Sequence, residues 1–102
     1  MAEASSLTLR LLTPNGTSAE TGCDGVQLLI RDGADGQRGG LVGILRGHAP
    51  AVMALGEGPV LAYRAHVPVF RAIVSGGFAS VAEDVVTVIT DSVTIEQLPE
   101  EQ

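Results

Sequence analysis

The chain has 102 residues, which is enough for one folded domain and too few for two separate cores. Hydrophobic residues make up 45% of it and aromatic residues only 3%, so the core must come mainly from Val, Leu, Ile and Ala. The formal net charge of −6 argues against binding to nucleic acid, because few cations are present to displace the counterions of phosphates. The same charge gives no attraction to anionic lipid headgroups.

Other classes of protein are disfavoured by what the sequence lacks. The single cysteine, Cys23, cannot form an internal disulfide and fits a reducing compartment. No run approaches the roughly 18 apolar residues that a membrane-spanning helix needs, so direct membrane insertion is not expected. Residues 1–6 are acidic and lead into no long apolar block, so no secretion signal is predicted.

Apolar residues alternate with a period of two along most of the chain, which is typical of β-strands. In chain order, the alternating runs are residues 7–12, 26–31, 61–64, 69–74, 85–90 and 93–98. Several of these runs have apolar residues on both faces, as expected inside a sandwich. The best helical candidate is the short segment 49–55.

Turn residues separate these runs. Pro14-Asn15-Gly16, Gly56-Glu57-Gly58-Pro59 and Glu83-Asp84 all combine residues that favour tight turns, and His66 falls on a predicted hairpin turn. Strands spaced this closely predict an all-β fold, a flattened sandwich or barrel of about eight to ten short strands, with no helix longer than two turns.

The predicted domain covers residues 1–98, and residues 99–102 form a short acidic tail. The glycine- and aspartate-rich stretch 31–40 is predicted to be a mobile surface loop between two strands. Phe70, Phe78 and Tyr63 are the expected aromatic anchors of the core. Phe78 follows Gly76-Gly77, for which we predict a tight bend or close backbone packing.

Several short motifs occur in a characteristic order. An opening strand ends in Thr13-Pro14, and the chain later runs through Gly43-Ile44-Leu45-Arg46-Gly47-His48-Ala49-Pro50. Leu55-Gly56-Glu57-Gly58, Gly76-Gly77-Phe78 and Val86-Thr87-Val88 follow. In this order and spacing, covering residues 7 to about 92, the chain resembles the amino-terminal β-sandwich domain of the epsilon subunit of F-type ATP synthases.

The resemblance implies a non-catalytic rotor subunit in the central stalk of the synthase. In that family the sandwich docks the gamma subunit onto the ring of c subunits and so couples proton translocation to ATP synthesis. It implies a peripheral position at the cytoplasmic face of a bacterial membrane and no cofactor. Family members usually continue into a helical hairpin. Nothing after Leu98 is predicted to form one, so inhibition of hydrolysis and nucleotide binding by a hairpin are not expected.

The residues expected at the partner interface come from the predicted loop and from the motif that follows it. The loop before Gly43 is longer than is usual in the family, and Arg46 stands where the family commonly has Pro. The predicted interface residues are Asp32, Asp35, Gln37, Arg38, Arg46 and His48. The alternative function is a stand-alone β-sandwich module that binds a sugar or a peptide. The sequence argues against it, because with no Trp and one Tyr it offers no aromatic platform for such a ligand.

No catalytic or metal site is predicted. His48, His66 and Cys23 lack metal-ligand spacing, and an orienting hydrogen bond from His48 to loop backbone is the preferred interpretation. Asp32 and Asp35 lack the late glutamate of a calcium loop. Gly76-Gly77 has no following helix or Lys-Ser/Thr to bind phosphate. Ser75 has no neighbouring base, and Cys23 is expected to be an inert thiol.

Overall fold

The computed structural model describes residues 7–31 and 39–96, and in these residues it contains ten strands and no helix. The predicted all-β fold of eight to ten strands is therefore confirmed. The strands are β1 (Leu7–Thr13), β2 (Gly16–Cys23), β3 (Gly25–Ile30), β4 (Gly40–Leu45), β5 (Ala51–Leu55), β6 (Gly58–Arg64), β7 (Val67–Val74), β8 (Gly77–Ala82), β9 (Val85–Ile89) and β10 (Val93–Glu96).

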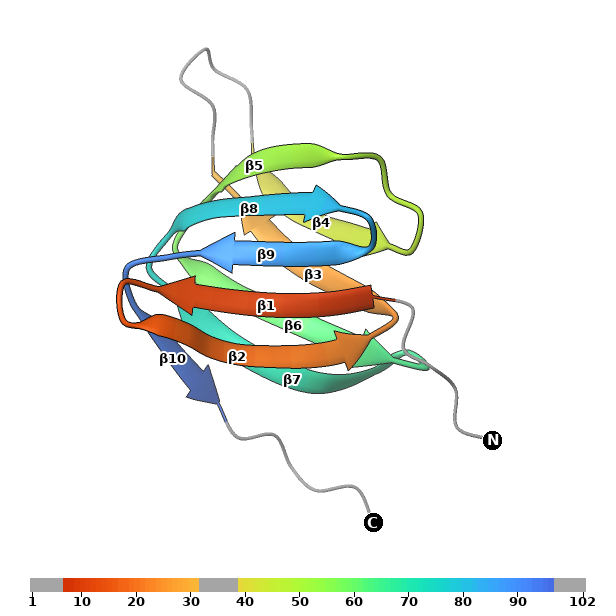
Figure 1. Ribbon diagram of the computed structural model, residues 1–102, viewed down its shortest axis with the longest axis horizontal. Helices are drawn as coiled ribbons and strands as arrows, with labels where there is room; N and C mark the ends of the chain where they lie inside the picture. Colours follow the sequence, from red (N-terminus) through yellow and green to blue (C-terminus); the bar gives the residue numbers. More distant parts are fainter. Residues whose placement is uncertain (1–6, 32–38, 97–102) are drawn as a thin grey trace.

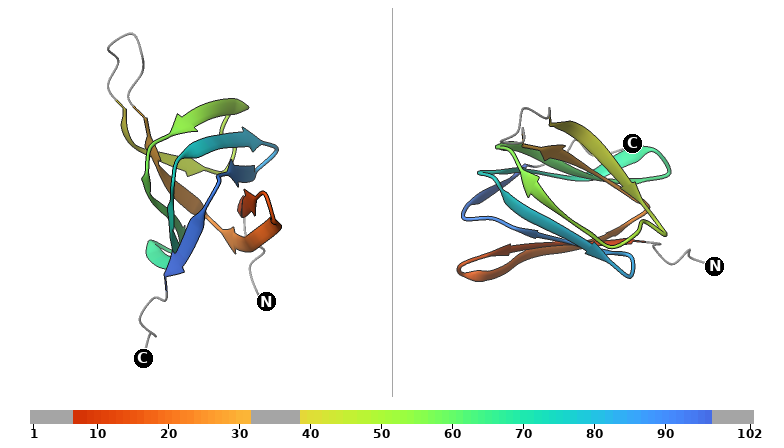
Figure 2. Two further views of the ribbon diagram at one scale, coloured as in Figure 1. Left: turned by 90° about the vertical axis from the view of Figure 1, so that its left-hand side faces the viewer. Right: turned by 90° about the horizontal axis from the view of Figure 1, so that it is seen from above.

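The strands form one curled sheet in the order β10-β7-β6-β3-β5-β8-β9-β1-β2, and β4 also pairs with β3. The two halves meet where β3 ends beside β5. There Ile30 pairs with Leu55, and the Arg31 N–H donates to the Ala54 carbonyl at 3.0 Å. Figures 1 and 2 show the sheet folded over on itself. We call β5, β8, β9, β1 and β2 the front sheet, and β4, β3, β6, β7 and β10 the back sheet.

The core fills the space between the two sheets. Leu7, Leu9 and Leu11 of β1 are at most 1% exposed, and the intervening residues of β1 point outward. The same alternation is clear in β6, β8 and β9. Each fully buried Val or Leu side chain contributes about 1.5–3 kcal/mol. The remaining buried apolar residues are Cys23, Val26, Leu28, Ile44, Leu55, Val60, Ala62, Ala72, Val74, Ala79, Val81, Val86 and Val88.

Two predicted turns have a specific hairpin geometry. Ala65 and His66 between β6 and β7 have φ of 51° and 67°, and Glu83 and Asp84 between β8 and β9 have φ of 51° and 63°. Two successive left-handed residues are the mark of a type I′ turn, whose twist matches that of the flanking strands. The predicted turns at His66 and at Glu83-Asp84 are therefore confirmed.

The sequence-based view of the aromatic side chains needs correction. Phe78 is 53% exposed, so the prediction that it is a core residue is wrong. Strand β8 explains this, since its alternation turns Ala79 and Val81 inward and leaves Phe78 on the outer surface. Tyr63 lies half-buried on the outer side of β6, and Phe70 packs against the core.

Four strands escaped the search for alternating runs. The helical candidate 49–55 is wrong, because Ala51–Leu55 is strand β5 and pairs along its length with β8. A helix of this length would have little stability of its own, so strand pairing decides the conformation. Strand β2 is mostly polar and β4 and β8 contain glycine, which obscures the signal in all three. Gly40, placed in the predicted loop, begins β4.

Gly77 allows β8 and β9 to approach closely at the predicted bend. Its φ is +114°, and a Cβ at this position would lie 2.0 Å from the Ile89 carbonyl oxygen. Gly16 has nearly the same φ, +115°, but a Cβ there would meet nothing within 4 Å. Close backbone packing at the Gly76-Gly77 bend is therefore confirmed. Gly16 needs glycine only for its positive φ, whereas Gly77 needs it both for its positive φ and for lack of space for a Cβ.

We predict that Gly77→Ala destabilises the protein more than Gly16→Ala does. Both substitutions force alanine into a glycine conformation, at about 1–3 kcal/mol each. Only Gly77→Ala also drives a side chain into backbone, which adds roughly 1–3 kcal/mol. Urea unfolding of both variants measures the difference, and equal stabilities would show that the β8–β9 approach relaxes freely.

Candidate docking surface

The outer surface of the front sheet is apolar around Phe78. The register places Ala54, Phe78, Ile89 and Leu12 side by side across four neighbouring strands. Val52 lies two residues further along β5. Phe78, Ile89 and Val52 are 53%, 51% and 74% exposed. We call these five residues the front face. An exposed cluster of large apolar side chains with a central aromatic is characteristic of a protein interface.

A loop and a turn border the Val52 end of the front face. Residues 46–50 connect β4 to β5, and Glu83-Asp84 connects β8 to β9. Both connections lie on the right of Figure 1. Arg46 is exposed, and the His48 side chain contacts the Ala49 carbonyl oxygen through Nδ1 at 2.7 Å. The predicted orienting hydrogen bond from His48 to loop backbone is therefore confirmed, and it shapes a loop that leads directly to Val52.

The six predicted interface residues are divided along the chain. Asp32, Asp35, Gln37 and Arg38 lie outside the described residues. Their described neighbours are Arg31, which follows the end of β3, and Gly39, which precedes the beginning of β4. Arg46 instead follows the end of β4. A six-residue strand spans roughly 17 Å at about 3.3 Å per residue. The structure therefore does not bring Arg46 and His48 next to Arg31 and Gly39, although Arg31 bonds to Ala54 of the front face.

Sequence reasoning missed the front-face residues Val52, Ile89 and Leu12. A signal was present, because β1, β5 and β9 carry apolar residues on both faces of the strand. That pattern was interpreted as burial on both sides within a sandwich. In the structure only one side of each strand is buried, so the second apolar side is surface.

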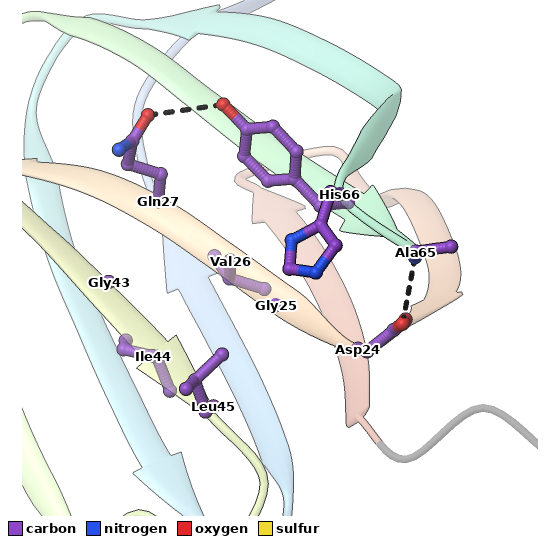
Figure 3. A pocket seen from close by; sticks show the side chains of 10 residues that line it. Asp24, Gly25, Val26, Gln27, Gly43, Ile44, Leu45, Ala65 and His66 are labelled. Atoms are coloured by element: carbon purple, nitrogen blue, oxygen red, sulfur yellow. Dashed lines mark hydrogen bonds between the residues drawn. The ribbon is translucent and has the colours of Figure 1, made fainter.

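The back sheet has a hollow on its outer surface with a volume of about 320 Å³ (Figure 3). Gly25 and Gly43 line it without side chains, and Leu45 and Tyr63 provide apolar surface. The Tyr63 hydroxyl donates to Gln27 Oε1 at 3.3 Å. Asp24 and His66 lie at one end, and Asp24 Oδ2 accepts a hydrogen bond from the Ala65 N–H at 2.9 Å. The hollow can accept one bulky apolar or aromatic group.

The reactive side chains are engaged in structural contacts. The Ser75 hydroxyl lies 3.2 Å from Thr90 Oγ1 and accepts a hydrogen bond from the Ser92 N–H. Burial raises the pKa of the Cys23 thiol, and the nearby Asp24 carboxylate adds to this shift. A raised pKa disfavours the reactive thiolate. Within residues 7–31 and 39–96 no group of three His, Cys, Asp or Glu side chains could hold a metal ion.

The fold is an all-β sandwich whose front sheet carries an exposed apolar face. The model of the family described as "ATP synthase, Delta/Epsilon chain, beta-sandwich domain" matches residues 6–96. The chain therefore belongs to this family, as the order of its motifs indicated. In the described part of the chain no helix is long and apolar enough to cross a membrane.

Two similar proteins are ATP synthase epsilon chains. The chain is 42% identical to the one of Chromohalobacter salexigens over 66 residues, which cover 65% of this chain and 44% of that one. It is 29% identical to the one of Desulfitobacterium hafniense over 89 residues, covering 87% of this chain and 61% of that one. The chain thus spans about half of the length of the relatives it matches.

Solved structures share the fold at low sequence identity. A chain in the Euglena gracilis mitochondrial ATP synthase matches with a TM-score of 0.69 and 20% identity, over 92% of this chain and 56% of that one. A chain from the central stalk and c-ring of the Tetrahymena thermophila mitochondrial ATP synthase matches with a TM-score of 0.61 and 12% identity, over 91% and 69%. These likenesses support the sandwich architecture.

We predict that Phe78→Ala changes stability by about 1 kcal/mol or less, because a half-exposed side chain loses little burial on truncation. Leu9→Ala, at a position 1% exposed on β1, serves as the buried comparison and is expected to cost about 2–5 kcal/mol. Thermal and urea unfolding measure both. A Phe78→Ala variant as unstable as Leu9→Ala would show that Phe78 supports the core.

Proposed function

We propose that this chain is a non-catalytic rotor subunit of a bacterial F-type ATP synthase, peripheral at the cytoplasmic face of the membrane. In this role it docks the gamma subunit onto the c-ring and couples proton translocation to ATP synthesis. The observation that carries the proposal is the exposed apolar front face on a member of the delta/epsilon family. A subunit that transmits torque needs a firm, water-excluding contact with its neighbour.

The gamma subunit is assigned to the front face for physical reasons. Phe78 stands in a row of apolar side chains, and Val52 extends this row towards the loop 46–50. A central aromatic surrounded by aliphatic side chains is the usual composition of an interface hot spot. Arg46 and His48 then fall at the polar rim, where charged groups affect association rate and orientation more than affinity.

We predict that Phe78→Asp weakens binding of the chain to gamma by roughly 30-fold or more, since loss of a hot-spot side chain costs about 2 kcal/mol or more. The matched control is Leu41→Asp, because Leu41 is 60% exposed on the outer surface of the back sheet. Titration calorimetry with purified gamma measures both variants. A larger loss from Leu41→Asp would place gamma on the back sheet instead.

The c-ring contact is proposed for the segment 32–38 between β3 and β4. Polar and charged residues in this segment suit the polar loops of a ring of membrane subunits. Ile30 and Gly40 are directly paired across the two strands, so a short connection can close this hairpin. Arg31 bonds to Ala54. The proposed ring contact would therefore adjoin the Phe78 end of the front face.

We predict that deletion of residues 33–37 leaves the melting temperature nearly unchanged and weakens binding to a gamma–c-ring assembly. Four residues would still connect Ile30 to Gly40, and loop-closure entropy changes slowly with length. Binding to gamma alone serves as the control and is expected to stay the same. A large loss of stability would indicate that the segment packs on the sandwich, and unchanged binding to the assembly would remove the proposed ring contact.

The hollow of the back sheet is the observation that favours the alternative, a binding module for a sugar or a peptide. Tyr63 and His66 offer ring surfaces beside two glycines, and Gln27 and Asp24 offer polar groups. Amide chemical shifts during titration with oligosaccharides or short peptides would test it. Saturable shifts confined to the hollow, in a chain that does not bind gamma, would favour this function over the rotor.

A further inference from the structure

The loop that borders the front face is held by one long-range side-chain contact. The Gly47 N–H donates to Asp84 Oδ1 at 2.8 Å, and the two residues are 37 positions apart in the chain. The bond connects the β4–β5 loop to the β8–β9 turn, which lie at the same end of the front sheet in Figure 1. A hydrogen bond to a carboxylate is among the stronger ones in proteins.

Asp84 is well anchored for this task. Its φ of 63° places it in the second position of the type I′ turn, where Asp is tolerated better than most residues. Its carbonyl oxygen accepts a hydrogen bond from the Thr8 N–H at 3.0 Å. The backbone of Asp84 is therefore tied to β1 while its side chain reaches the loop. The carboxylate thus holds the loop in place relative to the front sheet.

The other hydrogen bonds of the loop are local within the described part of the chain. The His48 N–H donates to the Leu45 carbonyl at 3.2 Å, and His48 Nδ1 contacts the Ala49 carbonyl oxygen. These bonds give the loop an internal shape. They do not tie the loop to β8 and β9, because both partners belong to the same segment. Pairing of Ala51 with Val81 holds the end of the loop against β8, and the Asp84 carboxylate holds its beginning at Gly47.

We propose that Asp84 is a positioning residue that presets the loop 46–50 for docking at the rim of the front face. The inference rests on the proposed docking to gamma and adds a residue that makes no contact with the partner itself. A loop already held in its bound conformation loses less conformational entropy on association, so the carboxylate raises affinity without entering the interface. Gly47 is the donor in this contact, with its N–H directed at Asp84 Oδ1.

The test uses substitutions that preserve the turn. Asp84→Gly removes the carboxylate and keeps a residue that readily adopts positive φ. Glu83→Gly makes the same kind of change at the neighbouring turn position, where φ is 51°, and is the matched control. Asp84→Asn restores an acceptor oxygen in the same place. Each full-length variant is studied for amide hydrogen exchange of Gly47, for melting temperature and for binding to gamma.

Asp84→Gly is expected to raise the exchange rate of the Gly47 amide at least tenfold relative to Glu83→Gly, with similar melting temperatures for the two. Affinity for gamma should fall about three- to tenfold, and Asp84→Asn should recover most of both effects. An unchanged Gly47 exchange rate in Asp84→Gly would overturn the positioning role.

Faster exchange with unchanged affinity would also overturn the inference, because the loop would then be positioned for something other than gamma. That result leaves the proposed docking intact if Phe78→Asp still weakens binding as predicted. If the wild-type chain does not bind gamma at all, the proposed function is removed. The exchange measurement would still report on the hydrogen bond between Gly47 and Asp84.

Discussion

The structure depends on one aliphatic layer enclosed by a sheet that folds over on itself. Leu9 of β1 is 1% exposed between the two halves, and its neighbours in this layer are Val, Leu, Ile and Ala side chains. Because the space between the sheets is filled by aliphatic residues, little room remains there for large rings. Phe78 and Tyr63 lie outside this layer, where they are available to other molecules.

The curl of the sheet also decides which residues share a surface. Pairing of Ile30 with Leu55 joins β3 to β5 and turns the two halves towards each other. The inner side of every strand is thereby committed to the core, and the outer side is left to be apolar or polar without affecting folding strongly. On the front sheet the outer side carries an apolar row, which suits the proposed docking of another protein.

The two sheets offer surfaces of different character. The front face is an exposed apolar cluster around Phe78, whereas the back sheet has a hollow lined by Gly25 and Gly43. An exposed apolar cluster suits a large protein partner, and a hollow suits a single inserted group. The Asp84 carboxylate belongs with the front face, since its hydrogen bond holds the loop that leads into β5.

The sequence by itself determined the fold class, because a period of two is a local property of the chain and turn residues are recognised one at a time. It also determined the family through the order of motifs such as residues 43–50, and the orienting bond of His48, which involves only its neighbour.

The sequence could not place Phe78, because two-sided apolar strands look alike whether one or both sides are buried. It could not find β2, whose residues are mostly polar, or β5, whose pairing partner lies more than twenty residues away. Only the tertiary structure aligned Ala54, Phe78, Ile89 and Leu12 and brought Asp84 to Gly47, because strand register and the closure of the sheet set these contacts.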